Sequence, residues 1–237
     1  MKRVIVYPDA ATVAKAAASR LLTVLADTLA VQERADIVLT GGTVGIQTLR
    51  EVAASPLVST VDWSAVHLWW GDERFVPTGD PDRNEGQAQE ALIAHLPVPA
   101  ENVHRMPSTD ITDSPETAAA LYFDELNQHG DPEFDVLMLG VGPDGHVASL
   151  FPGHSVYEKS AATVVAVLDS PKPPPVRITL GITALNRAKR VWLVAAGEEK
   201  AESIAEALHG NTTYPAAAVH GELETVWLLD VAAASKA

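Results

Sequence analysis

Cysteine is absent from this 237-residue chain, and long hydrophobic runs are absent as well. Without cysteine there is no disulfide, no thiolate metal site and no cysteine nucleophile, which fits a cytoplasmic protein. No stretch approaches the apolar length of a membrane span, and the amino-terminal residues lack the apolar core and the cleavage site of a secretory signal. We therefore expect a cytoplasmic protein with no membrane partner.

Positive charge is scarce too. The chain has 17 lysines and arginines against 31 aspartates and glutamates, which gives a formal net charge of −14. It has no cluster of basic residues of the kind that a phosphate backbone requires, so we expect no nucleic-acid partner. If the substrate is an anion, local arginines, lysines and backbone N–H groups must reverse the overall field at the site.

Hydrophobic residues make up 47% of the chain, which is enough for a full core at this length. Strand-like apolar runs alternate with alanine-rich stretches of helical spacing. The expected strands are residues 4–7, 37–40, 66–70, 136–140, 163–167, 191–195 and 225–229, and the expected helices include 10–30, 45–53, 115–128 and 198–208. This alternation predicts a single α/β domain over residues 1–237, with a mostly parallel, Rossmann-like sheet and helices on both faces.

The most informative stretch is residues 134–153, where the apolar run 136–139 gives way to a glycine-rich turn that carries His146. A single histidine is more often a surface or core residue, so the context carries this interpretation. An imidazole at the carboxyl end of a strand is well placed for acid–base chemistry, and Asp144 lies two residues upstream. We therefore predict that His146 is a functional residue.

A second glycine turn, Thr40-Gly41-Gly42-Thr43, follows the apolar residues 37–39 and precedes a helical stretch. Free N–H groups, the positive end of a helix dipole and two threonine hydroxyls would favour an oxyanion such as phosphate. The turn lacks the lysine of a P-loop and the spacing of a dinucleotide fingerprint. An ordinary strand-to-helix turn is the alternative.

Charged residues follow three of the predicted core segments. Asp72 and Arg74 come after the apolar run 66–70, where Arg74 could engage substrate oxygens while Asp72 orients the Arg74 side chain. The alternative is that these charged residues form a solvated turn. Arg177 follows a proline-rich loop at 170–176, and Lys200 follows the strand predicted at 191–195. If Arg177 and Lys200 reach the Thr40–Thr43 turn, they supply the charge that holds a phosphate dianion; otherwise they are merely solvated.

Together these segments resemble the 6-phosphogluconolactonase family, which belongs to a wider group with glucosamine-6-phosphate deaminases and ribose-5-phosphate isomerases. The resemblance runs through TGGT at 40–43, GDERFVP at 71–77, Asn84, GVGPDGHVASLFPG at 140–153, PPVRIT at 174–179 and GEEKA at 197–201. The block around His146 is the most specific, while the TGGT turn is shared with the deaminases. The match covers nearly the whole chain.

The resemblance implies hydrolysis of 6-phospho-D-glucono-1,5-lactone to 6-phospho-D-gluconate, in the oxidative pentose phosphate pathway, without a cofactor or metal. By position, His146 would be the general base on water, Asp144 would orient the imidazole, and Arg74 would bind the sugar acid and stabilise developing charge. The phosphate would be held by Gly41, Gly42, Thr43, Arg177 and Lys200, with Thr40 and Asp72 completing the substrate-binding set. We expect a monomer, with a dimer as the alternative.

Two other functions stay open. A glucosamine-6-phosphate deaminase would share the phosphate turn and the histidine, but that group usually continues DGH with Phe-Asn-Glu, whereas Val147-Ala148-Ser149 follows here. A noncatalytic sugar-phosphate sensor would keep the fold without the chemistry, which the retained His146 disfavours. Because no nucleophile elbow surrounds Ser149, we expect it to have a structural role in a helix. In the phosphate turn, Val44-Gly45 replaces the family's usual proline, which leaves the shape of the turn open.

Overall fold

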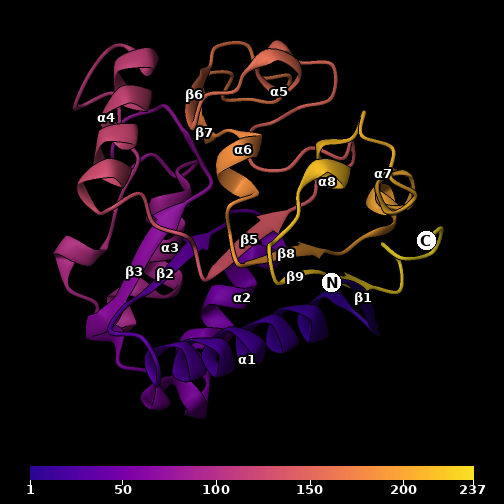
Figure 1. The fold of residues 1–237 in the computed structure, drawn as a ribbon. Helices are drawn as coiled ribbons and strands as arrows, with labels where there is room; N and C mark the ends of the chain where they lie inside the picture. Colours follow the sequence, from indigo (N-terminus) through magenta and orange to yellow (C-terminus); the bar gives the residue numbers. More distant parts are fainter.

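The central feature of the computed structural model, which describes residues 1–237, is a six-stranded parallel sheet (Figure 1). Its strands, in their order across the sheet, are β1 (Lys2–Tyr7), β9 (Glu224–Asp230), β8 (Arg190–Ala195), β5 (Val136–Gly140), β2 (Ala35–Leu39) and β3 (Val66–Trp70). The inner strands consist almost entirely of buried residues, as expected of a parallel sheet covered on both faces. Six of the seven predicted strands lie in this sheet, so the α/β prediction is confirmed.

A second, antiparallel sheet of three short strands has the order β4 (Asp72–Arg74), β7 (Arg177–Leu180) and β6 (Val164–Val167). The sequence predicted β6 but not its place outside the main sheet. β4 and β7 were not predicted, because they are only three and four residues long and carry charged side chains. The solvated turn considered at 72–74 is wrong: Asp72 and Glu73 are buried there.

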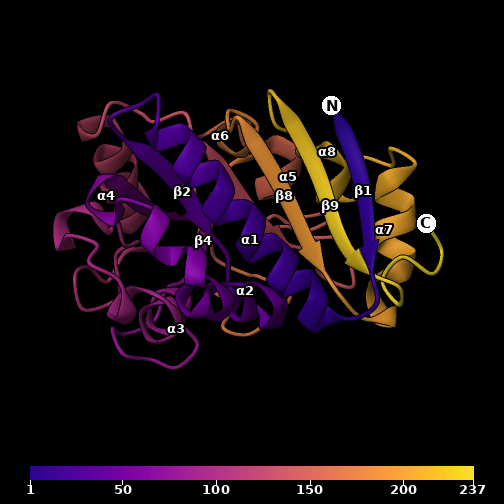
Figure 2. The same ribbon diagram turned by 90° about the horizontal axis from the view of Figure 1, so that it is seen from below.

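Helices cover both faces of the main sheet, as predicted. The helices are α1 (Ala10–Leu29), α2 (Thr43–Ala54), α3 (Asn84–Ala91), α4 (Pro115–Gln128), α5 (Ser155–Lys159), α6 (Ile182–Leu185), α7 (Ala201–Leu208) and α8 (Pro215–Ala218). Figure 2 shows α1 and α2 lying across one face, while in Figure 1 α6, α8 and the second sheet lie on the other side. One apolar core of 59 buried residues joins the elements. No helix combines the length and the hydropathy needed to cross a membrane.

Helix boundaries follow the capping residues. Asp9 caps α1 by accepting a hydrogen bond from the Thr12 amide at 2.7 Å, and Ser114 caps α4 in the same way through the Thr117 amide at 3.1 Å. Pro115 occupies the first turn of α4, where its missing N–H costs nothing. These signals explain why both helices begin where the sequence predicts.

The strand order β8-β5-β2-β3 brings four carboxyl-terminal ends side by side. The segments that follow these strands carry the predicted site groups: Lys200 after β8, His146 after β5, the Thr40–Thr43 turn after β2, and Asp72–Arg74 after β3. In an open parallel sheet, this edge is where ligands bind. The topology therefore assembles one site from residues scattered between positions 40 and 200.

Candidate active site

A cavity of about 370 Å³ opens at this edge of the sheet. Only two of its 16 lining residues are hydrophobic, which suits a small, highly polar ligand. The lining residues are Thr40, Gly41, Gly42, Thr43, Asp72, Arg74, Asn84, Gly140, Val141, Gly142, Pro143, His146, Ala148, Arg177, Glu199 and Lys200. Every site residue predicted from the sequence therefore lines the cavity except Asp144, which reaches it through His146.

His146 and Asp144 form the closest polar contact in the site: 2.5 Å separates the His146 Nδ1 atom from Asp144 Oδ1. An ionised carboxylate only accepts hydrogen bonds, so Nδ1 carries the proton and Nε2 presents its lone pair. Burial raises the pKa of Asp144, but the hydrogen bonds and charges of His146 and Lys172 outweigh burial and hold that pKa well below its usual value. Asp144 thus stays ionised and fixes the tautomer in which Nε2 can accept a proton.

Lys172 is a member of the site that the sequence analysis missed. Its Nζ atom lies 3.1 Å from Asp144 Oδ1 and 3.1 Å from His146 Nδ1. Because an ammonium group only donates, Lys172 binds the carboxylate whenever Nδ1 is protonated. The signal available in the sequence was the proline-rich loop at 170–176, which carries Lys172 and leads to the predicted site residue Arg177.

The predicted phosphate turn leads directly into α2, whose first residue is Thr43. Gly42 precedes the helix with a φ of 79°, a backbone conformation that glycine adopts at little cost, and no side chain caps the first amides. Val44 and Gly45 lie inside the first turn of α2, so the helix begins without the family's proline. A helix amino end without a cap or an acidic first-turn residue can receive an anion.

A hydrogen bond ties this turn to the strand that precedes His146. The Gly140 amide donates to Thr40 Oγ1 over 3.2 Å. Because β2 and β5 pair in parallel, with Ile37 opposite Val136, the two turns leave the sheet together. A phosphate on one turn and a reacting group at the other can therefore belong to one small molecule.

Arg74 extends from β4 and lines the cavity. Its Nη1 donates to the Asp82 carbonyl at 2.6 Å and to Asn84 Oδ1 at 2.7 Å, while its buried Nε has no partner in the chain. The sequence predicts that Asp72 orients Arg74, but in the structure Asn84 and the Asp82 backbone make these contacts. The Nη2 group makes no hydrogen bond within the chain and is the guanidinium donor left for ligand oxygens.

Glu73 supports this part of the site from beneath. Its carboxylate accepts hydrogen bonds from the amides of Arg74, Asn84 and Glu85 at 2.7–2.8 Å, and the last two amides begin α3. Burial raises the pKa of Glu73 to about 7, although Arg83 and the three amides act in the opposite direction. Glu73 thus caps α3 across the chain and places Asn84 beside Arg74.

Asp72 and Ser149 form a buried pair in which the Ser149 hydroxyl donates to Asp72 Oδ2 at 2.6 Å. Ser149 does have structural contacts, but the helix expected around it is wrong, because residues 147–150 form a tight turn. Ala148 in this turn has a φ of 49°, which a helix does not permit. The Asp72 carboxylate is therefore largely committed inside the protein.

Arg177 and Lys200 both reach the cavity, as their predicted roles require. The Arg177 guanidinium also donates to the carbonyls of Lys172, Pro173 and Pro174, at 3.0–3.2 Å, and so holds the proline loop in place. Burial lowers the pKa of Lys200, which Glu199 and Asp230 partly oppose. A phosphate beside Lys200 would favour the charged ammonium.

Known proteins of one family match this chain over nearly its whole length. The family model described as glucosamine-6-phosphate isomerases/6-phosphogluconolactonase matches residues 8–227. The chain is 47% identical over 245 residues to the 6-phosphogluconolactonase of Streptomyces coelicolor, and the match covers 99% of this chain and 94% of that protein. It is 43% identical to the 6-phosphogluconolactonase of Mycobacterium tuberculosis, with 98% and 96% covered.

Solved structures give the same result. The 6-phosphogluconolactonase of Thermotoga maritima matches with a TM-score of 0.87 at 28% identity, over 97% of this chain and 100% of that one. A monomeric glucosamine-6-phosphate deaminase matches with a TM-score of 0.82 at 24% identity, over 99% and 100%, a likeness that concerns the fold alone. The family model and the full-length relatives together show that this chain belongs to the glucosamine-6-phosphate isomerase/6-phosphogluconolactonase family.

Proposed function

We propose that this chain hydrolyses 6-phospho-D-glucono-1,5-lactone to 6-phospho-D-gluconate. The observation that carries the proposal is the presence, in one polar cavity, of an oriented His146–Asp144 pair and an uncapped helix amino end at Thr43. Such a cavity can hold a phosphate at one end while a carbonyl faces the imidazole at the other. The relatives from Streptomyces coelicolor and Mycobacterium tuberculosis are named for this activity.

In the proposed reaction, His146 Nε2 accepts a proton from a water molecule as the water oxygen bonds to the lactone carbonyl carbon. Arg74, with its free donors, stabilises the negative charge that develops on the carbonyl oxygen. The tetrahedral intermediate then collapses, the bond between the carbonyl carbon and the ring oxygen breaks, and His146 returns the proton to that ring oxygen. The new carboxylic acid then loses a proton to solvent.

General-base assistance and phosphate binding are the two contributions to the rate enhancement. General-base assistance typically contributes about 10²–10⁴-fold. Binding the phosphate at Gly41–Thr43, Lys200 and Arg177 would hold the distant carbonyl in position, which converts binding energy into orientation at the reacting carbon. No covalent intermediate is needed, and Ser149 is unavailable as a nucleophile because it is buried against Asp72.

The second candidate is a glucosamine-6-phosphate deaminase, because the family includes such enzymes and one shares the fold. The residues after His146 favour the lactonase. Val147, Leu150 and Phe151 are buried and apolar, so this segment provides no carboxylate to assist the histidine. A sensor without chemistry is the third candidate.

One experiment separates the three. The lactone is produced fresh by glucose-6-phosphate dehydrogenase, and its hydrolysis is followed against the spontaneous rate, with ammonia release from glucosamine 6-phosphate measured in parallel. Acceleration that disappears in His146→Ala supports the lactonase. Ammonia release indicates the deaminase, while a raised melting temperature with phosphogluconate but no turnover indicates the sensor.

A further inference from the structure

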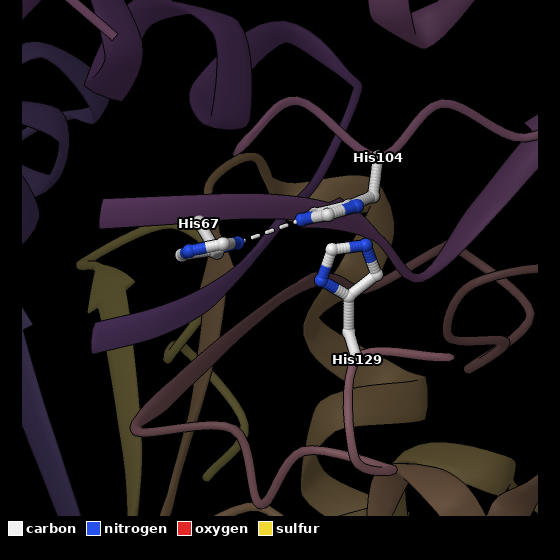
Figure 3. A group of neighbouring side chains, drawn as sticks. All are labelled: His67, His104 and His129. Atoms are coloured by element: carbon white, nitrogen blue, oxygen red, sulfur yellow. Dashed lines mark hydrogen bonds between the residues drawn. The ribbon is translucent and has the colours of Figure 1, made fainter. Parts of the chain in front are cut away.

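Three histidines that take no part in the proposed reaction gather at another place in the fold (Figure 3). His67 lies near the amino end of β3, His104 follows a short 3-10 helix, and His129 ends α4. One nitrogen from each ring can be chosen so that all lie within 4.8 Å of one another. The catalytic cavity lies at the carboxyl ends of the strands and shares no residue with this histidine cluster.

Glu125 sets the orientation of two of the rings. Its Oε1 atom lies 2.7 Å from His104 Nδ1 and 3.4 Å from His129 Nε2. Because the carboxylate only accepts, His104 must donate from Nδ1, which leaves a lone pair on His104 Nε2. That Nε2 atom points at His67 Nδ1, 2.8 Å away. A carboxylate that binds one imidazole nitrogen while the other faces a common centre is the usual environment of a metal-binding histidine.

Packing holds His104 rigidly in this position. Its ring stacks on Trp69 with the centroids 3.7 Å apart and the planes at 12°, and the residue is only 2% exposed. His67 and His129 are partly exposed, so an ion could enter from solvent. A fixed buried ligand beside two accessible ones is consistent with a site that fills after folding.

The surrounding charges permit a cation. The nearby Arg34 guanidinium is neutralised by Asp36 through contacts of 2.6 and 2.7 Å. Glu125, by contrast, has only imidazoles as partners.

We propose that His67, His104 and His129 bind one divalent transition-metal ion of the Zn²⁺ class. Imidazole nitrogens suit such ions, and three histidines with an open position for water complete a tetrahedral site. With metal–nitrogen bonds of about 2.0–2.1 Å, tetrahedral geometry sets the ligand nitrogens about 3.3 Å apart. The His67 and His104 nitrogens must therefore separate slightly from 2.8 Å, while His129 moves inward.

The position of His129 allows that movement. It ends α4 and is followed by Gly130 with a φ of 81°, so a small rotation there does not disturb a strand or the helix interior. His67 needs only to move its Nδ1 proton to Nε2, which releases the Nδ1 lone pair. The hydrogen bond between His67 and His104 is exchanged for two metal bonds.

The test uses the full-length, untagged chain, because a histidine tag would itself bind Zn²⁺. After treatment with a chelator, Zn²⁺ is titrated in competition with a chromophoric chelator, and the Co²⁺ form is examined by absorption spectroscopy for tetrahedral coordination. We expect one equivalent of Zn²⁺ per chain. Changing a residue that orients a metal ligand typically costs about 10–100-fold in affinity, so Glu125→Gln should weaken binding by that factor and His129→Gln or His67→Gln by at least as much.

Two control variants make the assignment specific. His95→Gln removes a histidine outside the cluster, whose ring nitrogen hydrogen-bonds the Glu90 carbonyl at 3.0 Å, and should leave Zn²⁺ binding unchanged. His146→Ala should also leave it unchanged, because that histidine belongs to the cavity. Circular dichroism shows whether each variant is folded. If His67→Gln does not fold, His129→Gln provides the test of the cluster. The proposal is overturned if no equivalent binds, if the folded cluster variants bind as tightly as the wild type, or if binding is lost in His146→Ala.

Discussion

Replacing Asp144 with asparagine should slow turnover strongly while leaving substrate binding almost unchanged. In the native site Asp144 Oδ1 accepts the Nδ1 proton of His146, which keeps the Nε2 lone pair available. An asparagine amide can instead donate to Nδ1, and this stabilises the tautomer with its proton on Nε2. In that tautomer His146 cannot accept a proton from water. Asp144 does not line the cavity, so the contacts to the phosphate remain.

The expected size of the loss follows from the step that is removed. General-base assistance is typically worth about 10²–10⁴-fold, and each factor of ten corresponds to about 1.36 kcal/mol in the barrier. The variant should therefore lose about 2.7–5.4 kcal/mol of transition-state stabilisation, seen in kcat rather than in KM. The side chain of Asp144 is 37% exposed, so the substitution should have little effect on folding.

The pH dependence sharpens this prediction. The hydrogen bonds from His146 and Lys172 outweigh the effect of burial, so the pKa of Asp144 lies well below its usual value. A lowered carboxyl pKa means that the ionised form persists as pH falls through the usual range and is lost only near the lowered value. Asp144 therefore stays ionised between pH 5 and pH 8, so its own titration should add no step to the pH profile of wild-type kcat in that range.

The assay is hydrolysis of freshly generated lactone, corrected for the spontaneous rate, with kcat and KM determined for each variant. Asp169→Asn is the matched control, because Asp169 pairs with His154 at 2.8 Å outside the cavity and should leave kcat unchanged. A kcat for Asp144→Asn within threefold of the wild type would refute the role of Asp144 as a positioning residue. A rise in KM alone would instead place Asp144 among the binding residues.

Three further substitutions test neighbouring parts of the site. Lys200→Met removes a cation from the cavity and should raise KM about tenfold or more with little change in kcat, because a charge-assisted hydrogen bond is worth about 1.5–3 kcal/mol. An unchanged KM would contradict phosphate binding by Lys200. Gly142→Ala would set a Cβ atom 2.0 Å from His146 Nδ1, so the imidazole ring must move and kcat should fall at least about tenfold. A kcat equal to that of the wild type would show that the position of the ring is not critical. Glu73→Gln puts an amide group where a carboxylate oxygen accepts a backbone amide and should lower the free energy of unfolding by about 1–3 kcal/mol, measured by denaturant titration. Burial raises the pKa of Glu73 to about 7, so the stabilising contribution of this side chain is complete below the usual glutamate pKa and is lost as pH rises through 7. The difference in melting temperature between the wild type and Glu73→Gln should therefore be smaller at pH 8 than at pH 5.

The main sheet could be predicted because each strand contains a short apolar run whose ends are marked by glycine, proline or charge, and the inner strands are buried on both faces. The second sheet could not. β4 consists of Asp72, Glu73 and Arg74, and nothing in its composition indicates a strand. Asp72 and Glu73 are buried there because other groups satisfy their carboxylates: Ser149 binds Asp72, and three backbone amides bind Glu73.

The pairing of the proposed catalytic residues that lie nearest in sequence could be predicted, while the more distant contacts could not. Asp144 and His146 stand two residues apart, so their pairing is visible in the sequence. Lys172 joins them from 26 residues further along, and Asn84 rather than Asp72 holds Arg74. Such contacts depend on how β4 and β7 lie against the main sheet, and that placement is decided by tertiary packing rather than by local pattern.

The acidic composition can be reconciled with an anionic ligand once the positions of the charges are known. The cavity contains three basic side chains, those of Arg74, Arg177 and Lys200, and two acidic ones, those of Asp72 and Glu199. Asp72 is occupied by Ser149, with Arg177 at 3.9 Å, and the amino end of α2 adds positive potential without any side-chain charge. A phosphate in this cavity is therefore attracted at short range, in spite of a net charge of −14 on the chain as a whole. The attraction depends on groups fixed by neighbouring strand ends, so the fold rather than the composition makes anion binding feasible.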